Sequence, residues 1–296
     1  MKILVAGLGL IGGSVCKAVH AYTDHSVYGW NRTKSVAEKA LAEHVIDGIV
    51  TDDCSGFDII IVCLYPDLTR TWVRTHLNSI SENAIVMDVS GVKNDLPEEL
   101  TKLCAEHHVQ YLSTHPMAGK ERAGFDVSDE GLFQGANFIM TPVSGTPKYV
   151  IAQVQNFAHQ IGFRKFVITT PEQHDRMIAY TSQLAHVVSS AYVRSPEIEL
   201  ETGFSGGSFH DMTRIASMNE NMWAELFMEN RESLVYELDF LIESLTKYRE
   251  AIFEGNYDAV YSLIREGRLR KEQNLERRKQ SGSVIDLTKK ESAYHE

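Results

Sequence analysis

The first part of the chain alternates short apolar runs with stretches of helical periodicity. The apolar runs have the length of strands and lie at 2–6, 26–30, 58–64, 84–89, 110–113, 138–141 and 165–168. Helical periodicity separates them, opening near Ile11 and recurring near 34–43, 67–79, 95–107 and 148–161. This alternation is typical of a doubly wound, mostly parallel sheet, and nearly continuous apolar runs fit strands that are covered on both faces. We therefore predict an α/β domain over residues 1–169.

The pattern changes at residue 170. The segment TPEQ at 170–173 has a hydroxyl N-cap, proline at the first helical position and glutamine three residues after the cap, which marks a helix start. From there the periodicity is mostly helical, with interruptions at Pro196, 203–208 and 255–256. We predict an all-α second domain over 170–280. Residues 281–296 have little to bury, and we expect them to form a disordered tail.

One long helix of the second domain carries an apolar stripe. Its members recur at steps of four and three, namely Leu234, Leu238, Leu241, Leu245, Tyr248 and Ile252. Such a stripe packs on another helix at a shallow angle. The partner is either another helix of the same domain or a second subunit. We favour a homodimer formed through the helical domain, because a long helix in a small domain has few neighbours of its own.

The first apolar run leads into a glycine-rich turn that reads G-x-G-x-x-G. Between a strand and a helix, the first glycine permits a tight turn, the second lets the backbone approach a pyrophosphate, and the third lets helix and strand pack closely. The helix N-terminus adds free N–H groups and the positive end of its dipole. We predict a Rossmann-type dinucleotide-binding domain whose cofactor contacts Gly7, Leu8, Gly9, Leu10, Ile11 and Gly12.

The residues after the second apolar run bear on the choice of cofactor. An acidic residue there would hydrogen-bond the ribose hydroxyls of NAD, but the sequence reads NRTK at 31–34. With no carboxylate to repel a 2′-phosphate, and with Arg32 present to pair with it, NADP is favoured over NAD. Solvated charges at a helix start are the alternative interpretation. We expect Asn31, Arg32 and Thr33 to contact the cofactor.

Composition and charge narrow the class of protein. The 296 residues, 43% of them hydrophobic, suit two domains, and the net charge of −11 argues against a nucleic acid partner. No apolar run approaches the roughly 20 residues needed to span a bilayer, so we expect a cytoplasmic protein without a membrane partner. The four cysteines have no C-x-x-C spacing and are expected to be reduced thiols. No metal site is predicted.

His115 is the first candidate for chemistry. It follows an apolar run, Pro116 keeps it out of helical geometry, and Gly119 permits a turn. We therefore predict that its ring is displayed from a loop at the carboxyl edge of the sheet, where ligands of doubly wound folds bind. A neutral imidazole there can accept a substrate proton near pH 7. A loop histidine that bonds only to the backbone is the alternative.

Two segments of the helical region carry further candidates. Small and polar residues that step by four, three and four share one predicted helix face, namely Asp175, Ala179, Ser182 and His186. This face either lines a cleft or forms buried polar contacts with neighbouring helices. The segment 206–214 is a flexible turn leading into a helix with Arg214. Its guanidinium is suited either to gripping a carboxylate by two parallel hydrogen bonds or to a structural salt bridge.

Together these segments resemble the prephenate/arogenate dehydrogenase family. The resemblance covers roughly residues 1–280 and lies in GLGLIGGS, HPMAGKERAG, SQLAHVV, and GGSFHDMTRIA followed by NMW. It implies an oxidative decarboxylation in tyrosine biosynthesis, in which the substrate ring passes hydride to NAD(P)⁺, its hydroxyl loses a proton, and CO₂ leaves as the ring aromatises. The predicted substrate is prephenate, giving 4-hydroxyphenylpyruvate. Arogenate, giving tyrosine directly, is the alternative.

The resemblance also implies roles for individual residues. His115 matches the catalytic histidine that takes the proton of the ring hydroxyl, and Arg214 matches the arginine that binds a substrate carboxylate. Other positions that line the family's active site are His186, Ser182, Glu121 and Gly207. Asp211 lies where a partner subunit is expected. Gln183 and His210 are expected to distinguish the keto side chain of prephenate from the amino side chain of arogenate.

Two positions depart from the family's pattern. Members often read G-S-V-K after the fourth strand, where this chain has SGVK at 90–93. The hydroxyl is displaced by one residue, and we expect Ser90 to contact the cofactor in its place. Many members also carry histidine at the position of Gln183.

Two other classes of protein share part of these features. A dehydrogenase for β-hydroxy acids would be expected to use a lysine on the first helix of the second domain, but no lysine lies between Pro171 and Arg194. A non-catalytic NADP-binding sensor would need the glycine motif, but it would not need His115, His186 and Arg214.

Overall fold

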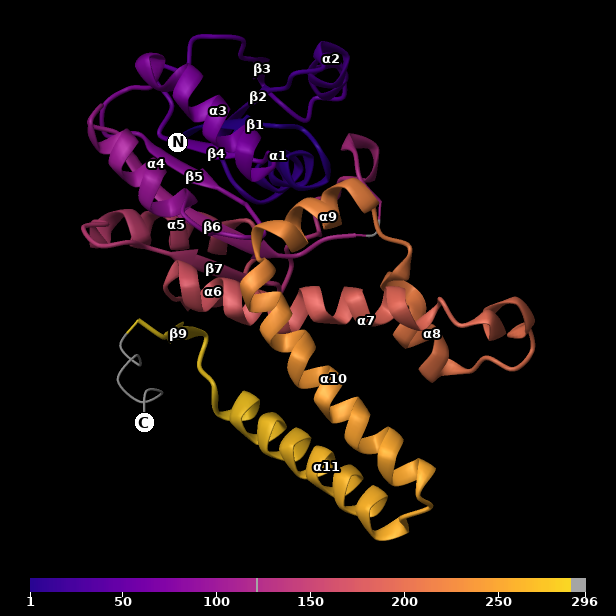
Figure 1. Cartoon of the computed structure of the whole chain (residues 1–296). Coiled ribbons are helices and arrows are strands. Elements are labelled where there is room, and N and C mark those ends of the chain that lie inside the picture. Colours follow the sequence, from indigo (N-terminus) through magenta and orange to yellow (C-terminus); the bar gives the residue numbers. More distant parts are fainter. Residues whose placement is uncertain (121, 289–296) are drawn as a thin grey trace. The chain divides into compact units, whose positions relative to one another are not determined.

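The computed structural model describes residues 1–120 and 122–288 (Figure 1). Its chain divides into two compact units. The first unit is Met1–Asp175 together with the segment that begins at Val284, and the second unit is Arg176–Ser283. No helix among the described residues is long and apolar enough to cross a membrane.

The first unit is built on one sheet, which runs β3-β2-β1-β4-β5-β6-β7-β8-β9 among the described strands. Seven strands coincide with predicted apolar runs: β1 (Lys2–Ala6), β2 (Ser26–Trp30), β4 (Ile59–Val62), β5 (Ile85–Asp88), β6 (Gln110–Met117), β7 (Asn137–Thr141) and β8 (Lys165–Ile168). The described pairs are parallel, except that β6 and β7 are antiparallel. The mostly parallel, doubly wound sheet is therefore confirmed.

Helices cover both faces of this sheet. They are α1 (Leu10–Tyr22), α2 (Lys34–Ala42), α3 (Pro66–His76) with the short η1 (Leu77–Ser79), α4 (Leu96–Ala105) and α5 (Lys148–Gln160); η2 (Phe125–Val127) is a single turn. Alternate residues of one strand fall in different hydrophobic clusters, Ile59 in one and Ile60 in the other. A strand that buries both faces needs a continuous apolar run, which is why the sequence showed these strands clearly.

The sheet is wider than predicted at both edges. The two-residue β3 (Gly48–Ile49) pairs with β2, and β9 (Val284–Asp286) pairs with β8 in parallel. The expectation of a disordered tail is wrong for this last segment. Its backbone groups fill the otherwise open edge of β8, and Leu287 extends the pairing by donating its N–H to the carbonyl of Ile168 at 2.8 Å. Residues 289–296 lie outside the described residues.

The second unit is helical, as predicted. Its elements are the end of α6 (Pro171–Ile178), η3 (Ala179–Gln183), α7 (Leu184–Tyr192), η4 (Pro196–Leu200), α8 (Gly207–Thr213), η5 (Arg214–Ala216), α9 (Glu220–Glu229), α10 (Arg231–Phe253) and α11 (Tyr257–Gln280). The predicted cap of α6 is present, because the N–H of Gln173 donates to Oγ1 of Thr170 at 3.2 Å.

The first long helix is interrupted by a turn of π-helix, η3. A π turn contains an extra residue, so the residues before and after it do not follow the spacing of a regular α-helix. The prediction that Asp175, Ala179, Ser182 and His186 share one face rested on a regular α-helical spacing, which this turn interrupts. Such turns are frequent at functional sites.

The apolar stripe of α10 is only partly covered within the chain. Helices α10 and α11 lie side by side as a hairpin joined by the predicted turn at 255–256 (Figure 1). Leu234 is buried, but Leu245 and Ile252 are 57% and 65% exposed. The same helix exposes Phe240 and Ile242. An apolar surface of this kind is typical of a protein–protein contact.

Candidate functional site

The glycine loop has the geometry of a phosphate-binding turn. Gly7 adopts φ +99°, and a Cβ on Gly12 would lie 1.8 Å from the carbonyl oxygen of Gly7, so the chain itself requires glycine at both positions. Gly9 has open space where its Cβ would stand, and it begins α1 without a side-chain cap. The free N–H groups of the first helical turn are thus left for an anionic ligand.

Asn31 connects this loop to the turn after β2. Its Oδ1 accepts the N–H of Leu8 at 2.9 Å, and its Nδ2 donates to the carbonyl of Thr33 at 3.0 Å. The side chain therefore holds the loop in place. Arg32, in contrast, is exposed and forms no hydrogen bond or ion pair with the described residues. Its guanidinium is available to a ligand.

Ser90 lies just beyond the end of β5. Its N–H donates to Oδ1 of Asp88 at 2.8 Å, but its buried Oγ has no hydrogen-bond partner among the described residues. A buried hydroxyl without a partner costs about 1–3 kcal/mol, which a bound ligand would recover. The ends of β1, β2 and β5 meet at the carboxyl edge of the parallel strands, where doubly wound folds bind dinucleotides. The residues present therefore fit a nicotinamide dinucleotide.

A buried ion pair supports the same edge. Lys93 and Asp88 are both fully buried, with Nζ 3.1 Å from Oδ1. The Lys93 Nζ also donates to the carbonyl of Thr114 at 2.6 Å, and Tyr111 donates its hydroxyl to the other carboxylate oxygen at 2.6 Å. These bonds join the end of β5 to β6, the strand that carries His115. The ammonium group of Lys93 is thereby held next to Thr114, the residue that precedes His115.

His115 lies within β6 and not on a loop, so that part of the prediction is wrong. The pairing of β5 with β6 ends at Ser113, whereas β6 continues along β7 with His115 opposite Ile139. Pro116 is tolerated in this extension because its nitrogen faces the side where β5 has ended. The predicted place at the carboxyl edge of the parallel strands is nevertheless the observed one.

A chain of three side chains begins at His115. Its Nδ1 lies 2.9 Å from Nε2 of His174, whose own Nδ1 lies 2.7 Å from Oδ1 of Asp175. The carboxylate of Asp175 also accepts the backbone N–H groups of Lys93 at 2.9 Å and Asn94 at 2.7 Å. All five residues belong to the first unit. His174 was not predicted, and the only sequence signal was a His-Asp pair in the first turn of a helix.

The surroundings keep His115 neutral. Burial lowers the pKa of His115 well below its usual value, and the neighbouring His174 and the charge of Lys93 lower it further. Burial also lowers the pKa of His174, against the opposing effect of Asp175. An imidazole that is neutral and has one ring nitrogen free to accept a proton is suited to act as a general base.

In the second unit, His186 is held between a backbone carbonyl and an aromatic ring. Its Nδ1 lies 2.9 Å from the carbonyl oxygen of Ser182, and its ring stacks on Trp223 with centroids 3.7 Å apart. Burial lowers the pKa of His186, and the charge of Arg214, which begins the η5 turn packed on α7, lowers it further. The structure thus brings His186 together with Ser182, the element of Arg214, and Trp223, a residue of the NMW motif for which the sequence indicated no role.

Gln183 is occupied by structural bonds. Its side chain is 1% exposed, its Oε1 accepts from Nδ2 of Asn230 at 2.8 Å, and its Nε2 donates to the carbonyl of Leu226 at 2.9 Å. These bonds tie η3 to the junction of α9 and α10. They count against the predicted substrate contact.

Most of the other predicted residues lie on α8 or directly after it. Gly207 begins α8, and His210 and Asp211 are exposed on that helix. Arg214 follows directly as the first residue of η5 and is also exposed. Glu121 lies outside the described residues.

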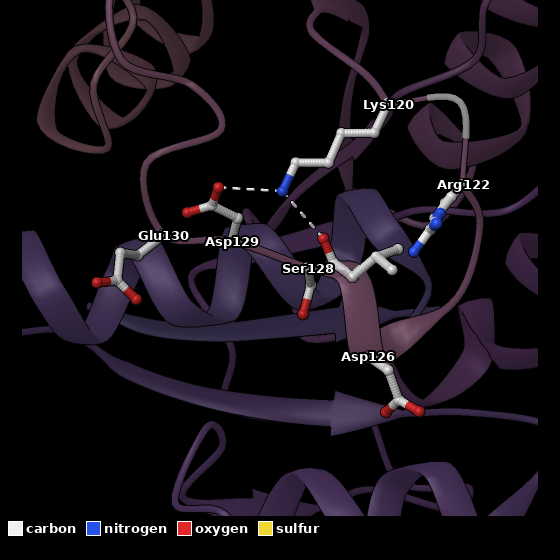
Figure 2. Close-up of a pocket in the computed structure, with 7 residues that line it drawn as sticks. Lys120, Arg122, Asp126, Ser128, Asp129 and Glu130 are labelled. Carbon is white, nitrogen blue, oxygen red and sulfur yellow. Dashed lines mark hydrogen bonds and ion pairs between the residues drawn. The ribbon is translucent and has the colours of Figure 1, made fainter.

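The segment that follows β6 borders a pocket of 620 Å³, shown in Figure 2. Lys120 reaches across it, with Nζ 3.0 Å from Oδ2 of Asp129 and 3.2 Å from the carbonyl oxygen of Val127. The segment is anchored to the helix of the glycine loop, because Lys17 donates to the carbonyl of Ser128 at 2.9 Å. The pocket is lined by both cationic and carboxylate side chains, so its lining shows no preference for ligands of one charge.

A glycine loop and a neutral histidine at the carboxyl edge of a doubly wound sheet, followed by a helical unit, define an oxidoreductase that uses a nicotinamide dinucleotide. Comparison with known families specifies the class. The family model for the prephenate dehydrogenase nucleotide-binding domain matches residues 15–176, and the model for the prephenate dehydrogenase dimerization domain matches residues 170–266. The chain therefore belongs to the prephenate dehydrogenase family, the oxidoreductases of tyrosine biosynthesis.

Individual relatives agree with this assignment. The cyclohexadienyl dehydrogenase of Zymomonas mobilis is 30% identical over 276 residues, which cover 89% of this chain and 92% of that protein. The structure of A. aeolicus prephenate dehydrogenase in complex with hydroxyphenyl propionate and NAD⁺ matches with a TM-score of 0.83 and 26% identity, covering 92% of this chain and 98% of that one. Synechocystis arogenate dehydrogenase matches with a TM-score of 0.79 and 25% identity, covering 93% and 100%.

Proposed function

We propose that this protein catalyses the NAD(P)-dependent oxidative decarboxylation of prephenate to 4-hydroxyphenylpyruvate and CO₂. The observation that carries the proposal is a neutral His115 at the carboxyl edge of the sheet. Its Nδ1 is engaged by His174, while no described residue bonds to its Nε2. A substrate hydroxyl at Nε2 would complete the site.

His115 has two tasks in this reaction. The bound dinucleotide supplies the acceptor for the hydride that leaves the ring carbon. Loss of that hydride would turn the ring hydroxyl into a protonated, high-energy carbonyl, so His115 takes the hydroxyl proton as the hydride departs. Once CO₂ has left and the ring is aromatic, the phenolate oxygen has a pKa of about 10 and regains a proton from the imidazolium. No net proton is released.

We assign binding of a substrate carboxylate to Arg214, whose planar guanidinium suits two parallel hydrogen bonds. His186 donates its Nδ1 proton to the carbonyl of Ser182, which holds its ring in place, and we assign it an orienting or binding role. Ser182, Gly207, Glu121 and Asp211 are assigned to the same binding role by their positions in the family motifs.

We infer that NADP is preferred over NAD. Asn31 stands where an acidic residue would read the ribose hydroxyls, and both ends of its amide are engaged by the backbone. The exposed Arg32 next to it is left for a 2′-phosphate. Gly7 to Gly12, Thr33 and Ser90 supply the other proposed contacts.

The choice between prephenate and arogenate rests on the side-chain end of the substrate. Relatives of this chain bear names with both specificities. Because Gln183 is engaged by Asn230 and Leu226, we assign the discriminating contact to His210.

Turnover of both substrates with both cofactors tests the proposed function. We expect NADP⁺ reduction to be faster with prephenate, with release of one CO₂ for each NADPH. Faster turnover of arogenate would reverse the substrate assignment. If neither substrate is turned over while NADP⁺ binds, the protein is a sensor of the dinucleotide.

A further inference from the structure

The bonds between His115, His174 and Asp175 determine which ring nitrogen of His115 carries its proton. We propose that His174 and Asp175 are positioning residues that hold His115 in the tautomer protonated at Nδ1, with the lone pair of Nε2 presented to the substrate. The value of this tautomer for catalysis rests on the proposed function. The tautomer itself is a property of the free protein and can be tested without substrate.

The argument starts at Asp175. Its Oδ1 accepts the N–H of Lys93 and its Oδ2 accepts the N–H of Asn94, so both oxygens of the carboxylate already act as acceptors. An ionised carboxylate only accepts hydrogen bonds, so the proton between Asp175 and His174 is carried by Nδ1 of His174.

The tautomer of His174 in turn determines the tautomer of His115. A neutral imidazole has one donor and one acceptor, so a His174 that donates from Nδ1 accepts at Nε2. The 2.9 Å contact there makes Nδ1 of His115 the donor. Its Nε2 is then the unprotonated nitrogen, which is the form that a general base needs.

The charges around the two rings keep both of them neutral. His174 contacts His115 from the start of α6, with Asp175 on its other side. Lys93, which follows β5, donates to the carbonyl of Thr114 next to His115 and is paired with Asp88. An added proton on His174 would turn Nε2 into a donor and force the His115 proton onto its own Nε2. The buried Lys93 opposes that charge. Asp175 and Asp88 favour it, but Asp175 shares its carboxylate with two backbone donors and Asp88 is paired with Lys93.

The tautomer is directly visible by nitrogen NMR of protein labelled with ¹⁵N-histidine. We expect the His115 ring, assigned by loss of its signals in His115→Asn, to show a protonated Nδ1 and an unprotonated Nε2 at pH 7 in the unliganded wild-type protein. A wild-type His115 with its proton on Nε2 would overturn the proposal, whatever the variants do.

Two substitutions of His174 separate positioning from packing. In His174→Gln the amide can still donate to Asp175 and accept from His115, whereas His174→Leu removes both bonds at a similar volume. We expect His174→Gln to keep the wild-type tautomer and a kcat within about threefold of wild type. We expect His174→Leu to shift His115 toward the Nε2-protonated form and to lower kcat at least tenfold, with the KM for substrate and the affinity for NADP⁺ unchanged.

The exposed His159→Leu, on α5, is the matched control and should behave as wild type. Equal losses of kcat in the Gln and Leu variants, or a Leu variant with wild-type turnover and tautomer, would show that His174 only fills space. If no protein, including wild type, turns over prephenate or arogenate, the proposed function fails while the NMR result still decides the tautomer.

Discussion

At the scale of single residues, the role proposed for each side chain follows from its surroundings more than from its residue type. Twelve histidines are spread along the chain. Among the histidines that the structure describes, His115 and His174 bond to each other, and the burial of both rings favours the neutral form. Gln183 shows the opposite case, in which a residue in a functional motif is used for structure.

The lowered pKa of His115 predicts the pH dependence of the reaction. The base must be neutral, so kcat/KM falls as the pH drops through the pKa of His115 in the free enzyme. Since burial, His174 and Lys93 lower that pKa, we expect the fall to lie below the ordinary imidazole value of about 6.5. A pH profile of kcat/KM measures it. An inflection at or above 6.5 would contradict a buried base.

Arg32 predicts the cofactor preference. If its guanidinium pairs with the 2′-phosphate, Arg32→Ala should weaken NADP⁺ binding by about 1–3 kcal/mol and leave NAD⁺ binding unchanged. Titration of both dinucleotides into both proteins gives the four dissociation constants. Lys34→Ala, two residues further on, is the control for a general loss of positive charge. Equal affinities of the wild-type protein for NADP⁺ and NAD⁺ would contradict the proposed preference for NADP.

At the scale of elements, burial decided what could be predicted from the sequence. Strands that bury both faces, such as β4, need continuous apolar runs and were found with bounds close to the observed ones. The two residues of β3 and the edge strand β9 are too short or too polar for such a signal. The pair of His115 with His174 could not be predicted either. It joins residues 59 positions apart through the packing of β6 and α6, which no local pattern reports.

The edge strand β9 is expected to stabilise the first unit. Ile285→Pro removes a backbone N–H from the ladder with β8, and each lost hydrogen bond costs about 0.5–1.5 kcal/mol. We expect a lower midpoint of thermal unfolding than in the wild-type protein, with Ser283→Ala, just before the strand, as the control. An unchanged midpoint in Ile285→Pro would mean that β9 is not paired in solution.

At the scale of the whole molecule, the apolar surface of α10 and the matched dimerization domain support a homodimer. We expect wild-type protein to sediment as a dimer at micromolar concentration. The double substitution Leu245→Glu and Ile252→Glu places two charges on the exposed apolar surface and should yield monomers. Ser244→Glu adds a charge at an exposed polar position of the same helix and should leave the dimer intact. A monomeric wild-type protein would contradict the homodimer and would limit the apolar stripe of α10 to contacts within its own domain.

The central claim is that His115 is the base of a prephenate dehydrogenase. The most direct test is steady-state turnover of prephenate with NADP⁺ by wild-type protein and His115→Asn, with dinucleotide affinity measured in both as the control for folding. We expect kcat to fall by about 10²–10⁴-fold in His115→Asn while substrate affinity changes little, because the proton moves only in the transition state. A His115→Asn enzyme with the turnover and pH profile of wild type would contradict the claim and move the search for the base to His186.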